Sequence, residues 1–196
     1  MHYPNGRKYS TPNQQIGTNK KESFGNRGMT LEEDINVTNS YYLQSNKAVI
    51  HKKPTPVQIV DVHYPKRSAA VITEGYFKQA STTDYNGLYR GKYVDFEAKE
   101  TKHKTRFPLA NIHDHQIKHM QSIVEHGGIC FLIIRFAILN ETYYLQAEKL
   151  FSFWNTKCNG GRQSIPYEAV KEDGYYIPFH LQKRVDYLQI IDRLYF

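Results

Sequence analysis

Two acidic residues and a lysine stand where a β-hairpin could bring them together. Asp84 lies before two possible turns, and Glu97 and Lys99 follow them in the pattern Glu-x-Lys. Asn86-Gly87 is the stronger local turn signal, but a turn there leaves only Leu88 and Tyr89 before the Arg90-Gly91 pair. Arg90-Gly91 leaves two strands of useful length. We therefore predict the turn at residues 90 and 91.

A two-residue loop at this position fixes which residues face each other. Residue 89 then faces residue 92, Asp84 faces Glu97, and Thr82 faces Lys99. Because side chains alternate along a strand, these four share one face of the hairpin. Facing Cβ atoms lie roughly 4.5–5.5 Å apart, so the two carboxylates repel one another. A divalent cation between them would remove this repulsion.

The predicted ligands indicate which cation and which reaction. Carboxylate and hydroxyl oxygens suit Mg²⁺, for which Mn²⁺ can substitute. The ammonium of Lys99 could hold a water molecule and stabilise charge in a phosphorane-like transition state. Gln116 adds a polar group on an apolar helix face, either as a metal ligand through its amide oxygen or as a helix-edge residue bonded to backbone. Together these groups indicate metal-assisted phosphodiester hydrolysis.

A competing group of three histidines does not fit a zinc site. His115 and His119 are four residues apart on one predicted helix face, and His113 lies beside them. The sequence has no His-Glu-x-x-His pattern here and no evident third ligand. Phosphate contact or an ordinary surface role is the better interpretation of these histidines.

Hydrophobic periodicity predicts the elements that must hold these residues. Thr30 and Glu33 form a capping box for a helix at 30–44. Asn111 and Asp114 offer caps for a second helix, which ends at a glycine pair. The other predicted elements are strands at 48–51, 129–136 and 142–147 and helices at 148–155, 166–173 and 186–194. Strands with helices on both sides of them in the sequence predict a mixed-sheet α/β domain.

A second hairpin is predicted between the first helix and the acidic pair. The β-rich runs 57–62 and 69–77 flank a polar turn that carries Lys66 and Arg67 at its tip. Lys52 and Lys53 precede it. We predict a rigid ribbon, or stalk, whose cationic tip binds DNA. The alternative is that the tip residues are simply solvated.

Composition limits the class of partner. The chain has 196 residues, with 26 Lys and Arg against 19 Asp and Glu, and a formal net charge of +7. This favours a polyanion, without choosing between DNA, RNA and an acidic membrane. No apolar run approaches the roughly 20 residues of a spanning helix, and two cysteines make no disulfide framework. We expect a soluble cytoplasmic protein.

The first 28 residues are predicted to be a separate arm. They carry five basic residues, including Arg27, against one acidic residue, and few apolar side chains. Such a segment cannot bury enough apolar surface to offset its ordering entropy. It is either a dispensable disordered arm or a basic arm that grips phosphates. Residues 29–196 are expected to form one nuclease domain, with the stalk at about 53–76.

Several strings resemble the RecU family of Holliday-junction resolvases from Gram-positive bacteria, and the resemblance covers nearly the whole chain. They are Asn26–Glu32, His51–Val60, Tyr64–Ser68, Ser81–Gly87, Asp95–Thr101 and His113–Gln116. The resemblance implies a PD-(D/E)xK nuclease fold (a restriction-endonuclease-like core), a homodimer and a stalk that enters the junction centre.

The resemblance also implies residue roles. Thr82, Asp84, Glu97 and Gln116 match the family's magnesium ligands, and Lys99 matches its transition-state stabiliser. Arg67 matches a stalk arginine of the family that acts on the junction and in modulation of the recombinase.

The expected function is therefore a Mg²⁺-dependent endonuclease that resolves Holliday junctions by paired symmetric incisions in recombination and DNA repair, near the nucleoid. One alternative is a non-catalytic architectural protein that binds junction DNA through the arm and the stalk. An architectural protein would not need the group formed by Asp84, Glu97 and Lys99. Another is a restriction-type nuclease acting on linear duplex, which a comparison of junction and duplex cleavage distinguishes.

Overall fold

The computed structural model describes residues 29–78 and 82–196. Its elements in chain order are α1 Leu31–Gln44, β1 Val49–Lys52, β2 Val57–His63, the short 3-10 helix η1 Arg67–Ala69, β3 Val71–Phe77, β4 Tyr85–Tyr89, β5 Lys92–Thr101, β6 Arg106–Pro108, η2 Leu109–Asn111, α2 Asp114–Glu125, β7 Ile129–Phe136, β8 Glu141–Gln146, α3 Ala147–Cys158, β9 Ser164–Pro166, α4 Tyr167–Asp173, β10 Tyr175–Ile177 and α5 Leu188–Tyr195.

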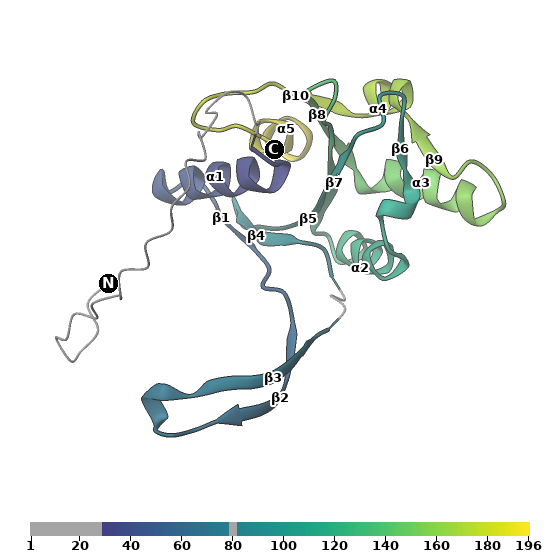
Figure 1. Ribbon diagram of the computed structural model, residues 1–196. Coiled ribbons are helices and arrows are strands. Elements are labelled where there is room, and N and C mark those ends of the chain that lie inside the picture. Colours follow the sequence, from purple (N-terminus) through teal and green to yellow (C-terminus); the bar gives the residue numbers. More distant parts are fainter. Residues whose placement is uncertain (1–28, 79–81) are drawn as a thin grey trace, which may run out of the picture.

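A six-stranded mixed sheet forms the centre of the molecule, in the order β1-β4-β5-β7-β8-β10 (Figure 1). Strands β5 and β7 pair in parallel, with Val94 opposite Ile129 and Thr101 opposite Phe136. The other neighbours in this sheet pair antiparallel. All eight residues of β7 are buried, because helices cover both faces of the sheet. This explains its nearly continuous apolar sequence.

Two hydrophobic clusters lie on opposite faces of the sheet. On one face, α1 and α5 pack over Val94, Phe96 and Phe131. On the other, α2, α3 and α4 pack over Cys130 and Leu132. Figure 1 shows α1 and α5 on one side of β5 and β7, with α2 and α3 on the other. The mixed α/β architecture expected from the sequence is confirmed.

The two predicted helix starts differ in outcome. The capping box at α1 is confirmed, because the Thr30 hydroxyl accepts from Glu33 N and the Glu33 carboxylate accepts from Thr30 N. At α2 the prediction of Asn111 and Asp114 as caps is wrong. Residues 109–111 form a 3-10 turn, and Asp114 is the first helical residue with His113 before it. The apolar spacing of residues 112–124 predicts the helix but does not predict the 3-10 turn that precedes it.

The predicted stalk is present as a two-stranded antiparallel ribbon of β2 and β3 (Figure 1). It projects away from the sheet, with Lys66 and the start of η1 at its far end. Its apolar side chains are exposed on both strands: Ile59 is 52 % exposed, Tyr76 60 % and Phe77 83 %. A two-stranded hairpin alone is only marginally stable in water, and this one exposes apolar side chains on both of its strands.

No helix in the described ranges, 29–78 and 82–196, is long and apolar enough to cross a membrane.

Candidate active site

The hairpin of β4 and β5 has the predicted register. Tyr89 pairs with Lys92 and Tyr85 with Phe96. The turn at Arg90 and Gly91 has positive φ at both residues, 47° and 77°, as a two-residue hairpin loop requires. Continuing the register by one residue places Asp84 opposite Glu97.

The competing turn signal at residues 86 and 87 lies inside strand β4. Gly87 sits where β1 approaches closely, and a Cβ there would come within 2.0 Å of the Val49 carbonyl oxygen. The glycine is therefore used for backbone approach and not for a turn.

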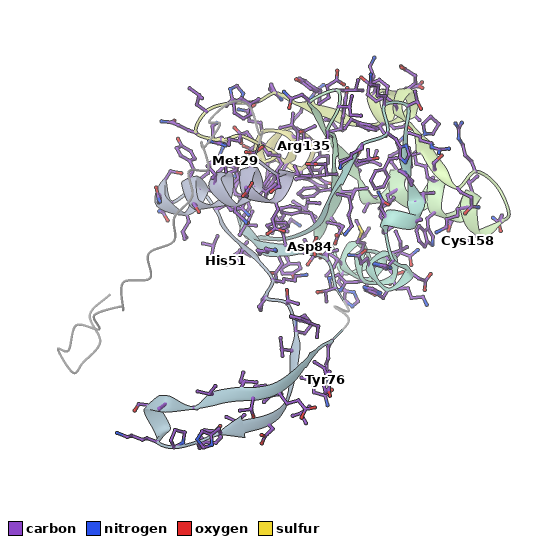
Figure 2. The ribbon with its side chains drawn as sticks, in the orientation of Figure 1. Met29, His51, Tyr76, Asp84, Arg135 and Cys158 are labelled. Atoms are coloured by element: carbon purple, nitrogen blue, oxygen red, sulfur yellow. The ribbon has the colours of Figure 1, made fainter. Side chains whose placement is uncertain are left out.

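Asp84, Glu97 and Lys99 meet where the stalk joins the sheet, as the position of Asp84 in Figure 2 shows. The Asp84 backbone N donates to Glu97 Oε2 at 3.2 Å, and Lys99 Nζ lies 2.6 Å from Glu97 Oε1. The Glu97 side chain is fully buried, whereas that of Lys99 is 25 % exposed. The acid is thus enclosed, and the ammonium reaches toward the surface.

The pKa of Glu97 is raised from its ordinary value near 4.5 to about 8, chiefly because the carboxyl group is buried. A hydrogen bond with the Asp84 side chain contributes to this rise, and the Lys99 ammonium opposes it. In the protein without a cation, Glu97 therefore keeps its proton near neutral pH. A divalent cation between the two carboxylates would take the place of that proton, so the donor set fits such an ion.

The two neutral ligands expected at this site currently bond to backbone. The Thr82 hydroxyl donates to the Thr83 carbonyl oxygen at 3.2 Å. Gln116 is buried on α2, and its Oε1 accepts from His113 N at 3.0 Å. An amide oxygen has two lone pairs, so this bond leaves one for another partner. Within the described part of the chain, no group of three or more His, Cys, Asp or Glu residues could hold a metal.

The histidines are not arranged as a pair of ligands. The rings of His113 and His115 stack, with centroids 5.4 Å apart. His119 Nε2 lies 3.3 Å from Oδ1 of Asp95. His119 therefore faces an acid inside the protein.

Sequence reasoning missed Asp95, a fully buried carboxylate on the same face of β5 as Glu97 and Lys99. The alternation that grouped Glu97 with Lys99 places residue 95 on that face as well. An acid inside a run of core residues was the available signal. Its contacts involve Lys53, Thr83, Tyr93 and His119.

The residues predicted to bind DNA lie in different settings. Lys66 is exposed at the tip of the stalk, where Arg67 begins η1. Lys52 Nζ forms an exposed ion pair with Glu32 at 2.5 Å. The Lys53 side chain is 18 % exposed, and its Nζ lies 2.7 Å from Asp95 Oδ2. Arg27 lies outside the described residues.

Comparison with known proteins gives a consistent result. The family model described as Recombination protein U matches residues 26–193. A protein named Holliday junction resolvase RecU from Oceanobacillus iheyensis is 64 % identical over 196 residues, which cover all of both chains. Proteins of the same name from Geobacillus kaustophilus and Bacillus subtilis are 58 % and 55 % identical, over all of this chain and 98 % and 96 % of theirs. The chain belongs to the RecU family.

Proposed function

We propose that this protein is a Holliday junction resolvase, a Mg²⁺-dependent endonuclease acting in recombination and DNA repair. The observation that carries the proposal is the buried Glu97 facing Asp84 with Lys99 beside it, in a chain whose relatives bear that name. A non-catalytic architectural protein would gain nothing from this arrangement. The mixed sheet flanked by helices is consistent with a nuclease-like core.

Asp84 and Glu97 hold the metal, with the oxygens of Thr82 and Gln116 completing its protein ligands. When bound, Mg²⁺ activates water and neutralises charge on the phosphate. The half-enclosed Lys99 ammonium orients the attacking water and stabilises the additional negative charge of the transition state. Burial of Glu97 keeps bulk water away from its carboxylate, which strengthens each of these interactions.

The protein acts as a homodimer. Resolution of a four-way junction into two duplexes needs paired incisions, and a two-fold dimer presents two active sites to a two-fold-related substrate. The exposed apolar side chains of the stalk support this assembly, because a second copy could cover them. Residues 29–196 form one nuclease domain in each copy, and the segment 1–28 adds positive charge.

Lys66 and Arg67 enter the centre of the junction, where phosphates from four strands crowd together. Lys52 and Arg27 add phosphate contacts outside the centre. The stalk arginine also serves in modulation of the recombinase. The protein works in the cytoplasm at the nucleoid.

The test is cleavage of a synthetic four-way junction against a linear duplex of the same sequence, with Mg²⁺ and with EDTA. The proposal requires Mg²⁺-dependent paired nicks in the junction and little cleavage of the duplex. The Asp84→Ala variant is the control and should bind the junction without cutting it. Equal cleavage of both substrates would indicate a duplex nuclease, and binding without cleavage by the wild type would indicate an architectural protein.

A further inference from the structure

Asp95 is a buried carboxylate that the proposed chemistry does not use. Its side chain has no exposed surface, and such a charge is costly unless it is fully paired. Lys53 Nζ lies 2.7 Å from Oδ2, and the Tyr93 hydroxyl donates to the same oxygen at 3.1 Å. The Thr83 hydroxyl donates to Oδ1, which also lies 3.3 Å from His119 Nε2. The carboxylate is therefore a hub for several elements.

Two of these partners come from the two chain segments at the base of the stalk. Lys53 directly follows β1, where the chain leaves the sheet, and Thr83 lies two residues before β4, where the chain returns. Lys53 Nζ also donates to Thr83 Oγ1 at 3.0 Å, and Lys53 N donates to the Asp84 carbonyl oxygen at 2.7 Å. Lys53, Thr83 and Asp95 thus form a clasp that ties both segments to β5.

The clasp lies next to both carboxylates of the active site. Thr83 is adjacent to Asp84 in the chain, and Asp95 precedes Glu97 by two residues on the same face of β5. Asp84 itself lies outside the ladder of paired residues, which begins at Tyr85. Its position opposite Glu97 therefore depends on contacts other than the strand pairing. Lys53 N bonds to the Asp84 carbonyl oxygen, and the neighbouring Thr83 bonds to Asp95.

We propose that Asp95 is a positioning residue, and that the clasp of Lys53, Thr83 and Asp95 holds Asp84 opposite Glu97 at the base of the stalk. This deepens the proposed function and rests on it. Lys53 then acts through Asp84 and not by contact with DNA. Residues that orient metal ligands without contacting the metal typically contribute about 10- to 100-fold to metal affinity or activity.

The first experiment measures Mn²⁺ binding to the full chain by calorimetry without DNA. Asp95→Asn should weaken binding by about 10- to 100-fold, and Thr83→Val should weaken it in the same direction. The matched control is Asp34→Asn, which removes the partner of Arg135 at 2.7 Å and of Arg184 at 3.1 Å, a largely buried acid on α1. It should lower thermal stability and leave Mn²⁺ affinity unchanged.

Wild-type Mn²⁺ affinity in Asp95→Asn and Thr83→Val, with only a loss of stability like that of the control, would overturn the proposal. If Asp95→Asn does not fold, Thr83→Val decides alone. If the wild type does not bind Mn²⁺, or binds it equally well after Asp84→Ala, the proposed metal site itself is refuted. Normal Mn²⁺ binding by the wild type and by both clasp variants refutes only the role of the clasp.

A second measurement distinguishes positioning from DNA contact. Lys53→Met should lower kcat for junction cleavage at subsaturating Mn²⁺ while leaving the junction KM unchanged, and excess Mn²⁺ should restore part of the rate. A raised KM with unchanged Mn²⁺ affinity would show that Lys53 contacts DNA, and the clasp would lose one of its three members.

Discussion

The protonated state of Glu97 should make the stability of the metal-free protein fall as pH rises. Burial raises its pKa from near 4.5 to about 8, so the folded protein holds a proton that the unfolded chain releases. The stabilisation is fully present below pH 4.5 and is lost progressively as pH rises through 8. One pKa unit corresponds to about 1.4 kcal/mol, so the loss is on the order of 3–5 kcal/mol.

Glu97→Gln removes this titration, because an amide stays neutral and can still bond to the Asp84 side chain. In EDTA, the variant should match the wild type near pH 5 and exceed its free energy of unfolding at pH 8.5. Urea unfolding at several pH values measures the difference between the two profiles. Glu125→Gln is the control, because Glu125 is an exposed acid at the C-terminal end of α2. Its pH profile of stability should match that of the wild type.

Parallel pH profiles for the wild type and Glu97→Gln would refute the reasoning, because they would show that Glu97 ionises as freely in the folded protein as in the unfolded chain. Adding Mg²⁺ at pH 8.5 provides a second check. It should stabilise the wild type, whose ionised carboxylates can bind the ion, and should stabilise the variant much less.

Asp84→Ala should abolish junction cleavage and keep junction binding in a gel-shift assay, and remaining cleavage would exclude Asp84 from the site. In metal-free protein above pH 8, where Glu97 is ionised, Asp84→Asn should not lower the melting temperature, because it relieves repulsion between the two carboxylates; a clear drop at that pH would count against the repulsion. Lys66→Ala combined with Arg67→Ala should weaken junction binding more than duplex binding, and an equal loss in a competition assay would make the tip an ordinary basic patch. Gly87→Ala should destabilise the fold by about 1–3 kcal/mol in urea unfolding, because its Cβ meets the backbone of β1. An unchanged midpoint would show that β1 can move away at little cost.

The sequence alone predicted the catalytic hairpin well because its register depends on local rules. A two-residue loop with positive φ at both positions and the alternation of side chains set the register from Tyr85 to Tyr89, which directs Asp84 toward Glu97. The strand at 129–136 and the stalk also follow from local composition. These features need no knowledge of distant contacts.

The environment of the site could not be predicted in the same way. Burial of Glu97, and hence its raised pKa, results from α2 packing over β5, which is a tertiary contact. In the sequence Lys53 looks like one of several surface lysines. In the structure it contacts Asp95, which lies 42 residues later in the chain. Gln116 was predicted either at the metal or bonded to backbone; its amide oxygen accepts from His113 N, just before its own helix, and keeps a second lone pair.

The last part of the chain also affects how the molecule folds during synthesis. Residues 185–191 close the cluster beneath α1, where Val185 N donates to Thr38 Oγ1 and the Tyr42 hydroxyl donates to Asp186. These partners are separated by 144–147 residues, which a ribosome adding about 5–20 residues per second makes in about 7–30 s. Throughout that interval the face of the central sheet that α1 covers lacks the residues of α5 that complete its cluster. The hairpin with Asp84 and Glu97 is made before α5, so the cluster behind it is complete only after these later residues have been added.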